Sequence, residues 1–226
     1  MNQLQFDEAP RIQAVNEPHL ACIILVDTSG SMTGCIDNLN KAICDFKNGV
    51  SVDELSRKRV DVAVVAFDDK TRISMPFSPV AEMECPRLDT GGMTNMGDAI
   101  NVAIDMVKER NRFYNTMGTP VFKPWIFMIT DGSPTDDISV AKKRIEEEEA
   151  KKKLKFFVVG VPGYDKHTMF QLTDRVIELE GAKFEGIFDW LSESMVTISV
   201  SKPGAEAPLP NLPEDSKKAE RDVSDW

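Results

Sequence analysis

Four short, almost purely apolar runs limit the fold of this chain more than any other feature of its sequence. They are Leu20–Val26, Val60–Phe67, Trp125–Thr130 and Phe156–Val161. Each is rich in β-branched or aromatic residues and too short for a typical helix. This is the pattern of strands that are buried on both faces of a sheet.

The segments between these runs have the 3.6-residue period of helices that pack on a core. One such period ends at Gly49, where a helix would stop, and another begins near Gly97. A third helix should carry Asp136 and Asp137 in its first turn, where carboxylates favour the helix dipole. The remaining predicted elements are two helices, Lys166–Thr173 and Phe184–Ile198, and two further strands, Thr71–Met75 and Arg175–Leu179.

Strands that alternate with helices predict an α/β fold with a doubly wound, mostly parallel central sheet, helices on both faces and one short antiparallel edge strand, Thr71–Met75. Residues 19–200 are expected to form one domain, preceded by an N-terminal arm over residues 1–18. Residues 201–226 hold four prolines and few apolar side chains, so a flexible polar tail is expected there.

The composition bears on partners and on compartment. A formal net charge of −10 disfavours a nucleic-acid partner, which would need clustered cations. No apolar run is long enough to span a membrane and the N-terminus does not resemble a signal peptide, so a cytoplasmic location without membrane contact is expected. The four cysteines (Cys22, Cys35, Cys44 and Cys85) lack zinc-site spacing, so we expect reduced, partly buried thiols.

Three polar groups of residues follow predicted strands or precede predicted helices. Asp27, Ser29 and Ser31 come directly after the first strand, Thr94 lies in a glycine-rich loop, and Asp131 follows the Trp125–Thr130 strand. In a doubly wound sheet, ligands bind beyond the carboxyl ends of the strands where the winding reverses, so these loops are expected to meet. Two carboxylates and three hydroxyls form an all-oxygen set, which favours Mg²⁺, with Mn²⁺ or Ca²⁺ as alternatives.

Other interpretations of these and nearby residues remain open. Ser31 or Thr33 could instead cap the following helix. Asp68 and Asp69 favour a solvated turn over a place in the site, and Asp136 and Asp137 favour a helix N-terminus over metal ligation. Met93 and Met96 flank Thr94 and are candidates for a rim that contacts a partner, whereas Met128 is expected in the core.

The pattern Asp27-Thr-Ser29-Gly-Ser31, a later Thr94 and a later Asp131-Gly resembles the metal-ion-dependent adhesion site of von Willebrand factor type A domains. The resemblance implies that Ser29, Ser31 and Thr94 contact the metal, with Asp27 and Asp131 binding directly or through water. It also implies a protein partner that offers an Asp or Glu carboxylate to the metal. Within this family the chain is similar to bacterial TerY/YegL-like proteins, which implies a link to tellurite resistance, stress response, and kinase or phosphatase partners.

The leading functional prediction is therefore a metal-dependent binding module without enzymatic activity. The alternative is a metal-dependent phosphatase or hydrolase in which Asp27 acts as the nucleophile. The sequence contains no Gly-x-Ser-x-Gly elbow, no phosphate-binding Gly-x-x-x-x-Gly-Lys loop and no histidine base near the site. A third interpretation is a site that is occupied by metal but has only a structural role.

Overall fold

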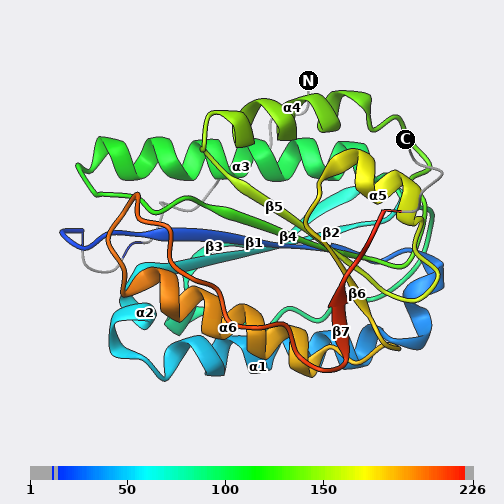
Figure 1. The fold of residues 1–226 in the computed structure, drawn as a ribbon, viewed down its shortest axis with the longest axis horizontal. Coiled ribbons are helices and arrows are strands. Elements are labelled where there is room, and N and C mark those ends of the chain that lie inside the picture. The colour runs from blue at the N-terminus through cyan, green and yellow to red at the C-terminus, as the bar shows by residue number, and fades with distance from the viewer. Residues whose placement is uncertain (1–11, 13–14, 222–226) are drawn as a thin grey trace.

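A mostly parallel sheet runs through the molecule between two layers of helices (Figure 1). The computed structural model describes residue 12 and residues 15–221. Only the two edge strands, β3 and β7, pair antiparallel to their neighbours. The strand order across the sheet is β3 (Thr71–Pro79), β2 (Val60–Phe67), β1 (Leu20–Asp27), β4 (Trp125–Thr130), β5 (Lys155–Gly160), β6 (Val176–Leu179) and β7 (Ser216–Lys218).

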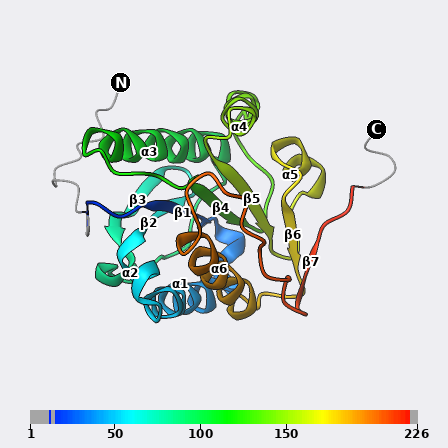
Figure 2. The same ribbon diagram turned by 60° about the vertical axis from the view of Figure 1, so that its left-hand side comes forward.

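The helices divide between the two faces of the sheet (Figure 2). One face carries α1 (Ile36–Ser51), α2 (Glu54–Arg59) and α6 (Glu185–Ser199). The other carries α3 (Met96–Thr116), α4 (Ser139–Ala150) and α5 (Lys166–Leu172). Two short 3₁₀ turns, Gly30–Gly34 and Val80–Glu82, complete the elements. The predicted doubly wound α/β fold is therefore confirmed.

Alternation along β1 explains why its sequence is apolar throughout. Ile24 belongs to the core beneath α1 and α6, together with Phe46 and Phe188. Ile23, which points to the opposite face, belongs to the core beneath α3 with Ile100. Each central strand therefore supplies side chains to both cores and has no solvent-facing side. Among the described residues, no helix is long and apolar enough to cross a membrane.

Two predicted helix boundaries are wrong because the residue that suggested each one instead contacts another helix. Helix α1 continues past Gly49 to Ser51, because this glycine permits a close approach to α6: a Cβ at Gly49 would lie 2.8 Å from Ser192 Oγ. Helix α4 begins at Ser139, so Asp136 lies before the helix. Its carboxylate instead accepts hydrogen bonds from the first backbone N–H groups of α3.

A flexible polar tail was predicted over residues 201–226, and this prediction is wrong for the residues that the structure describes, 201–221. Ser216–Lys218 forms β7 and pairs with β6, so the sheet has two antiparallel edge strands where one was predicted. Trp190 Nε1 donates to the Pro210 carbonyl oxygen at 3.0 Å, and Leu209 packs against the core. A few apolar contacts and an available strand edge order this segment despite its prolines. Residues 1–11, 13–14 and 222–226, most of the predicted arm and the chain end, lie outside the described residues.

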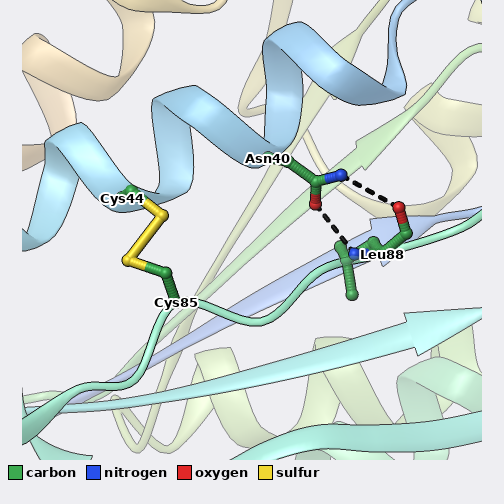
Figure 3. Close-up of a disulfide and its surroundings, with 4 residues drawn as sticks. All are labelled: Asn40, Cys44, Cys85 and Leu88. Carbon is green, nitrogen blue, oxygen red and sulfur yellow. Dashed lines mark hydrogen bonds between the residues drawn. A yellow bond between two sulfur atoms is a disulfide. The ribbon is translucent and has the colours of Figure 1, made fainter.

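A disulfide joins Cys44 of α1 to Cys85 in the loop after β3 (Figure 3). The expectation that all four thiols are reduced is therefore wrong for this pair, whereas Cys22 and Cys35 are free and buried. One helical turn away, the Asn40 side chain donates to the Leu88 carbonyl oxygen and accepts from the Leu88 N–H, both at 2.9 Å. Two independent links thus fix this loop to α1.

A fully buried polar cluster lies where β1 and β2 begin. The Asp61 carboxylate accepts hydrogen bonds from the His19 ring at 2.7 Å and from the Tyr114 hydroxyl, and pairs with Arg110 at 3.3 Å. Burial raises the pKa of Tyr114, which keeps its hydroxyl protonated as a donor. Arg110 also stacks on Phe113, 5.2 Å from the ring centre. These contacts to Asp61 all reach its Oδ2 atom and offset the burial of its charge, whereas Oδ1 has no hydrogen-bond partner among the described residues.

Candidate metal centre

Three loops meet beyond the carboxyl ends of the neighbouring strands β1 and β4. Asp27 is the last residue of β1, and Asp131 directly follows β4, with which β1 pairs in parallel register. Strands β2 and β3 lie on one side of this pair, and β5, β6 and β7 lie on the other. The winding reverses here, so the loops meet at the point of the fold where the sequence predicted that they would.

Hydrogen bonds connect four of the five predicted site residues. Asp27 Oδ1 accepts from the Ser29 N–H at 2.8 Å, and the Ser29 and Ser31 hydroxyls lie 3.1 Å apart. The Ser31 hydroxyl then donates to Asp131 Oδ1 at 2.7 Å. A turn with alternating side chains thus brings residues about a hundred positions apart in sequence into direct contact.

Thr94 is held at the same place by the neighbouring loop. Thr94 N–H donates to Thr135 Oγ1 at 3.1 Å, and the Thr135 N–H donates to the Thr94 carbonyl oxygen at 2.8 Å. A Cβ built on Gly132 would lie 3.6 Å from Thr94 Oγ1 and 3.8 Å from Asp27 Oδ2. Both oxygens therefore border the small space above Gly132, and the structure brings all five predicted residues together.

The glycines before Thr94 allow the loops to approach closely. Gly91 N–H donates to the Thr28 carbonyl oxygen at 2.9 Å, and Gly30 N–H donates to the Gly92 carbonyl oxygen at 3.2 Å. Gly92 has a φ of +75°, and a Cβ there would lie 2.7 Å from Asp69 Oδ2. Only glycine fits without strain at this position.

The electrostatic setting of Asp27 suits a cation. Its side chain is fully buried, and burial raises its pKa while hydrogen bonds from Thr130 and Ser29 oppose that shift. The nearby Asp131 carboxylate raises the pKa further, because it disfavours a second negative charge. A divalent cation between the two carboxylates would relieve both effects.

The donor set fits a hard divalent cation. It consists of two carboxylates and three hydroxyls, all oxygen ligands of the kind that Mg²⁺ and Ca²⁺ select. Among the described residues, no group of three or more His, Cys, Asp or Glu side chains could hold a metal ion, so a cation here would need neutral oxygens beside the two carboxylates. The capping alternative is not supported, because no side chain caps the N-terminus of α1 and Ser31 Oγ donates to Asp131 instead.

The other candidate residues near the site differ in exposure and in the contacts they make. Met93 is 58% exposed beside the site, as expected for a rim residue, whereas Met96 is fully buried in the core and the prediction for it is wrong. Asp68 forms an ion pair with Arg72, and Asp69 accepts a hydrogen bond from the Met93 N–H at 2.9 Å. Both aspartates therefore support the loops. Met128 is buried, as predicted.

Sequence reasoning missed two residues that organise the site. Thr130 donates to Asp27 Oδ2 at 2.6 Å, and Thr135 holds Thr94 through the two bonds described above. Thr130 is the only polar residue at the end of its apolar run, which could have indicated a role. Thr135 carries no such signal, because its role depends on the contact between the loop after β4 and the loop before α3.

Comparison with known proteins identifies the domain. Residues 22–133, which include all five site residues, match the family model described as von Willebrand factor type A domain. No curated protein sequence matches the chain.

Solved structures share the fold at low sequence identity. A von Willebrand factor type A protein from Catenulispora acidiphila has a TM-score of 0.60 at 16% identity and covers 80% of this chain and 43% of its own. Proximal thread matrix protein 1 from the mussel byssus, described with a zinc-occupied MIDAS motif, has a TM-score of 0.57 at 16% identity, with 80% and 48% covered. The pilus adhesin SpaC from Lactobacillus rhamnosus GG has a TM-score of 0.62 at 13% identity, with 82% and 31% covered.

The chain spans less than half the length of each of these three structures. The likeness therefore concerns the fold of one domain. The match over residues 22–133 supports a von Willebrand factor type A domain in this chain, and the solved structures share its α/β fold.

Proposed function

We propose that this domain binds a divalent metal ion through Asp27, Ser29, Ser31, Thr94 and Asp131, and uses the ion to hold an Asp or Glu side chain of a protein partner. The observation that carries this proposal is the hydrogen bond from Ser31 to Asp131, which closes the gap between the loops after β1 and β4. It supports the proposal because it brings oxygen atoms of both loops into direct contact.

Each residue has a separate task in this proposal. Asp27 and Asp131 neutralise the dication, and Thr130 and the Ser29 N–H keep the Asp27 carboxylate oriented. Ser29, Ser31 and Thr94 add neutral oxygens, which leave the bound ion electrophilic and able to accept one more carboxylate. Met93 offers an exposed, adaptable apolar side chain beside that position.

The identity of the metal is part of the proposal. Oxygen ligands favour Mg²⁺, with Mn²⁺ or Ca²⁺ as alternatives. The mussel byssus structure is described with zinc in its MIDAS motif, so Zn²⁺ belongs in the same titration.

The rival function is a phosphatase or hydrolase with Asp27 as nucleophile. Both Asp27 oxygens accept hydrogen bonds and the side chain is fully buried, so neither oxygen faces open solvent for attack on a substrate. This observation favours binding over catalysis. Turnover of p-nitrophenyl phosphate with Mg²⁺ that is lost in Asp27→Asn would reverse the preference.

The biological setting rests on the TerY/YegL-like resemblance alone. We propose a role in bacterial stress response of the tellurite-resistance type, or beside a kinase or phosphatase, in the cytoplasm. The Cys44–Cys85 disulfide gives a test of that compartment, because cytosolic thiols are normally kept reduced. Alkylation of the protein in intact cells should label both cysteines if the cytoplasmic proposal is correct.

Thermal unfolding after EDTA treatment, followed by titration of each metal, tests the central proposal. A ligand that binds only the folded state stabilises by about 2.7 kcal/mol at 100 times its dissociation constant. For a domain of this size that corresponds to a rise of about 5–11 °C in Tm. Ser29→Ala should abolish the rise, whereas Ser74→Ala, an exposed serine on β3, should retain it.

A wild-type protein as insensitive to metals as Ser29→Ala would contradict metal binding. The partner step is tested separately, by capture of Asp- and Glu-containing peptides with the metal present and after EDTA. Capture that survives EDTA would leave the metal with a structural role only.

A further inference from the structure

A large cavity opens at the end of the sheet opposite the candidate metal centre. It has a volume of about 810 Å³ and is lined by Trp125 and Lys155, the first residues of β4 and β5. The C-terminal turns of α3 and α4 and the segment after α6 form its other walls, which meet on the left of Figure 1. This volume lies within the range of small-molecule binding sites.

Cations dominate the lining, although the whole chain has a formal net charge of −10. Two acidic residues, Glu148 and Glu206, also border the cavity. The six basic residues that line it are Lys108, Arg112, Lys123, Lys152, Lys153 and Lys155. The cavity is thus a local concentration of positive charge on an acidic protein.

Most of this charge has no carboxylate partner. Lys108 pairs with Glu148 at 2.9 Å, and Arg112 pairs with Glu109. Within the described part of the chain, the remaining four lysines have no carboxylate at ion-pair distance. These four cations therefore line the same space without a directly paired carboxylate.

Lys155 shows this crowding most clearly. Its ammonium lies 5.4 Å from the centre of the Trp125 ring, on the floor of the cavity. Burial lowers its pKa, and repulsion from Lys123 and Arg175 lowers it further, while Glu206 and Glu149 oppose the shift. Repulsion between these cations lowers the stability of the fold. Their placement together is therefore better explained by an anionic ligand than by stability.

The C-terminal dipole of α4 explains part of the cluster, because cations are favourable there. It accounts for Lys152 and Lys153, which follow that helix. It does not account for Lys123, which precedes β4, or for Lys155, the first residue of β5. Lys123 lies before a strand and Lys155 begins one, and both still line the cavity.

We propose that this cavity binds a small molecule that carries two or more phosphate groups. Ammonium groups on flexible stems act as point charges that surround phosphate oxygens from several sides. Asn111 also lines the cavity, and its buried Oδ1 has no hydrogen-bond partner among the described residues.

Calorimetric titration with tripolyphosphate, in EDTA and low salt, tests the proposal. Lys123→Gln/Lys155→Gln should weaken binding about tenfold or more, since two charges are removed from the cavity. Lys143→Gln, an exposed lysine on α4 outside the lining, is the matched control and should bind like wild type. Glu206→Gln should bind more tightly, because it removes a repulsive charge.

If the double variant does not fold, the exposed Lys153→Gln replaces it, with an expected loss of about threefold. No binding by wild type would overturn the proposal, as would an equal loss in Lys143→Gln, which would indicate only general attraction. Citrate binding as tight as tripolyphosphate would overturn the assignment to phosphate. Ser29→Ala should bind tripolyphosphate normally, so failure of the metal centre and failure of this site are distinguishable.

Discussion

Asp61→Asn should destabilise the domain more than almost any other isosteric substitution. The carboxylate has no access to water, and it receives hydrogen bonds from His19 and Tyr114 and an ion pair from Arg110. Asparagine keeps the shape but removes the charge with which Arg110 pairs in the core. Breaking a buried ion pair in this way typically costs about 3–5 kcal/mol, or about 6–20 °C in Tm for a domain of this size.

Urea unfolding followed by tryptophan fluorescence and circular dichroism measures this loss. The design needs a second variant, Asp61→Asn/Arg110→Met, which removes the cation as well. If breaking the Asp61–Arg110 pair causes the loss of stability, the double variant is more stable than Asp61→Asn alone. The reasoning is refuted if Asp61→Asn unfolds within about 1 kcal/mol of wild type, or if removal of Arg110 adds to the loss.

Three further predictions concern the loops and helix ends. Thr135→Val removes the acceptor for the Thr94 N–H, so metal affinity should fall about tenfold with little change in stability, as calorimetric titration would show. Cys44→Ser opens a link between residues 41 positions apart, and unfolding in denaturant should become easier by about 3–4 kcal/mol, matched by reduction of wild type. Asp53→Ala removes the N-cap of α2 and should cost about 0.5–2 kcal/mol at pH 7. Since hydrogen bonds from Ser56 lower the pKa of Asp53, its contribution is present above the ordinary carboxyl pKa and disappears as the pH falls through the lowered value.

The parts of the fold that sequence predicted well are those where one physical effect dominates. The runs Val60–Phe67 and Trp125–Thr130 are strands with the expected bounds, because burial on both faces requires apolar residues at every position. Their order then placed Asp27 and Asp131 at neighbouring strand ends. The five candidate ligands come together for that topological reason.

The errors occur where the role of a residue depends on a contact with a segment distant in sequence. Gly49 looked like a helix stop, but its lack of a side chain serves the contact with Ser192. Asp136 looked like part of the first turn of its own helix, but it caps α3. Local patterns carry no information about such partners, which also explains why the Cys44–Cys85 pairing was not predicted.

The short strand β7 has a consequence for any shortened form of this chain. A fragment that ends at residue 200 would leave β6 with a free row of backbone N–H and C=O groups, since β7 is its outer neighbour. An open edge of this kind is a template for pairing with another chain and for aggregation. The native edge instead presents Lys217 and Lys218, whose charges disfavour that pairing. The last residues of this domain therefore help to keep it from associating with copies of itself.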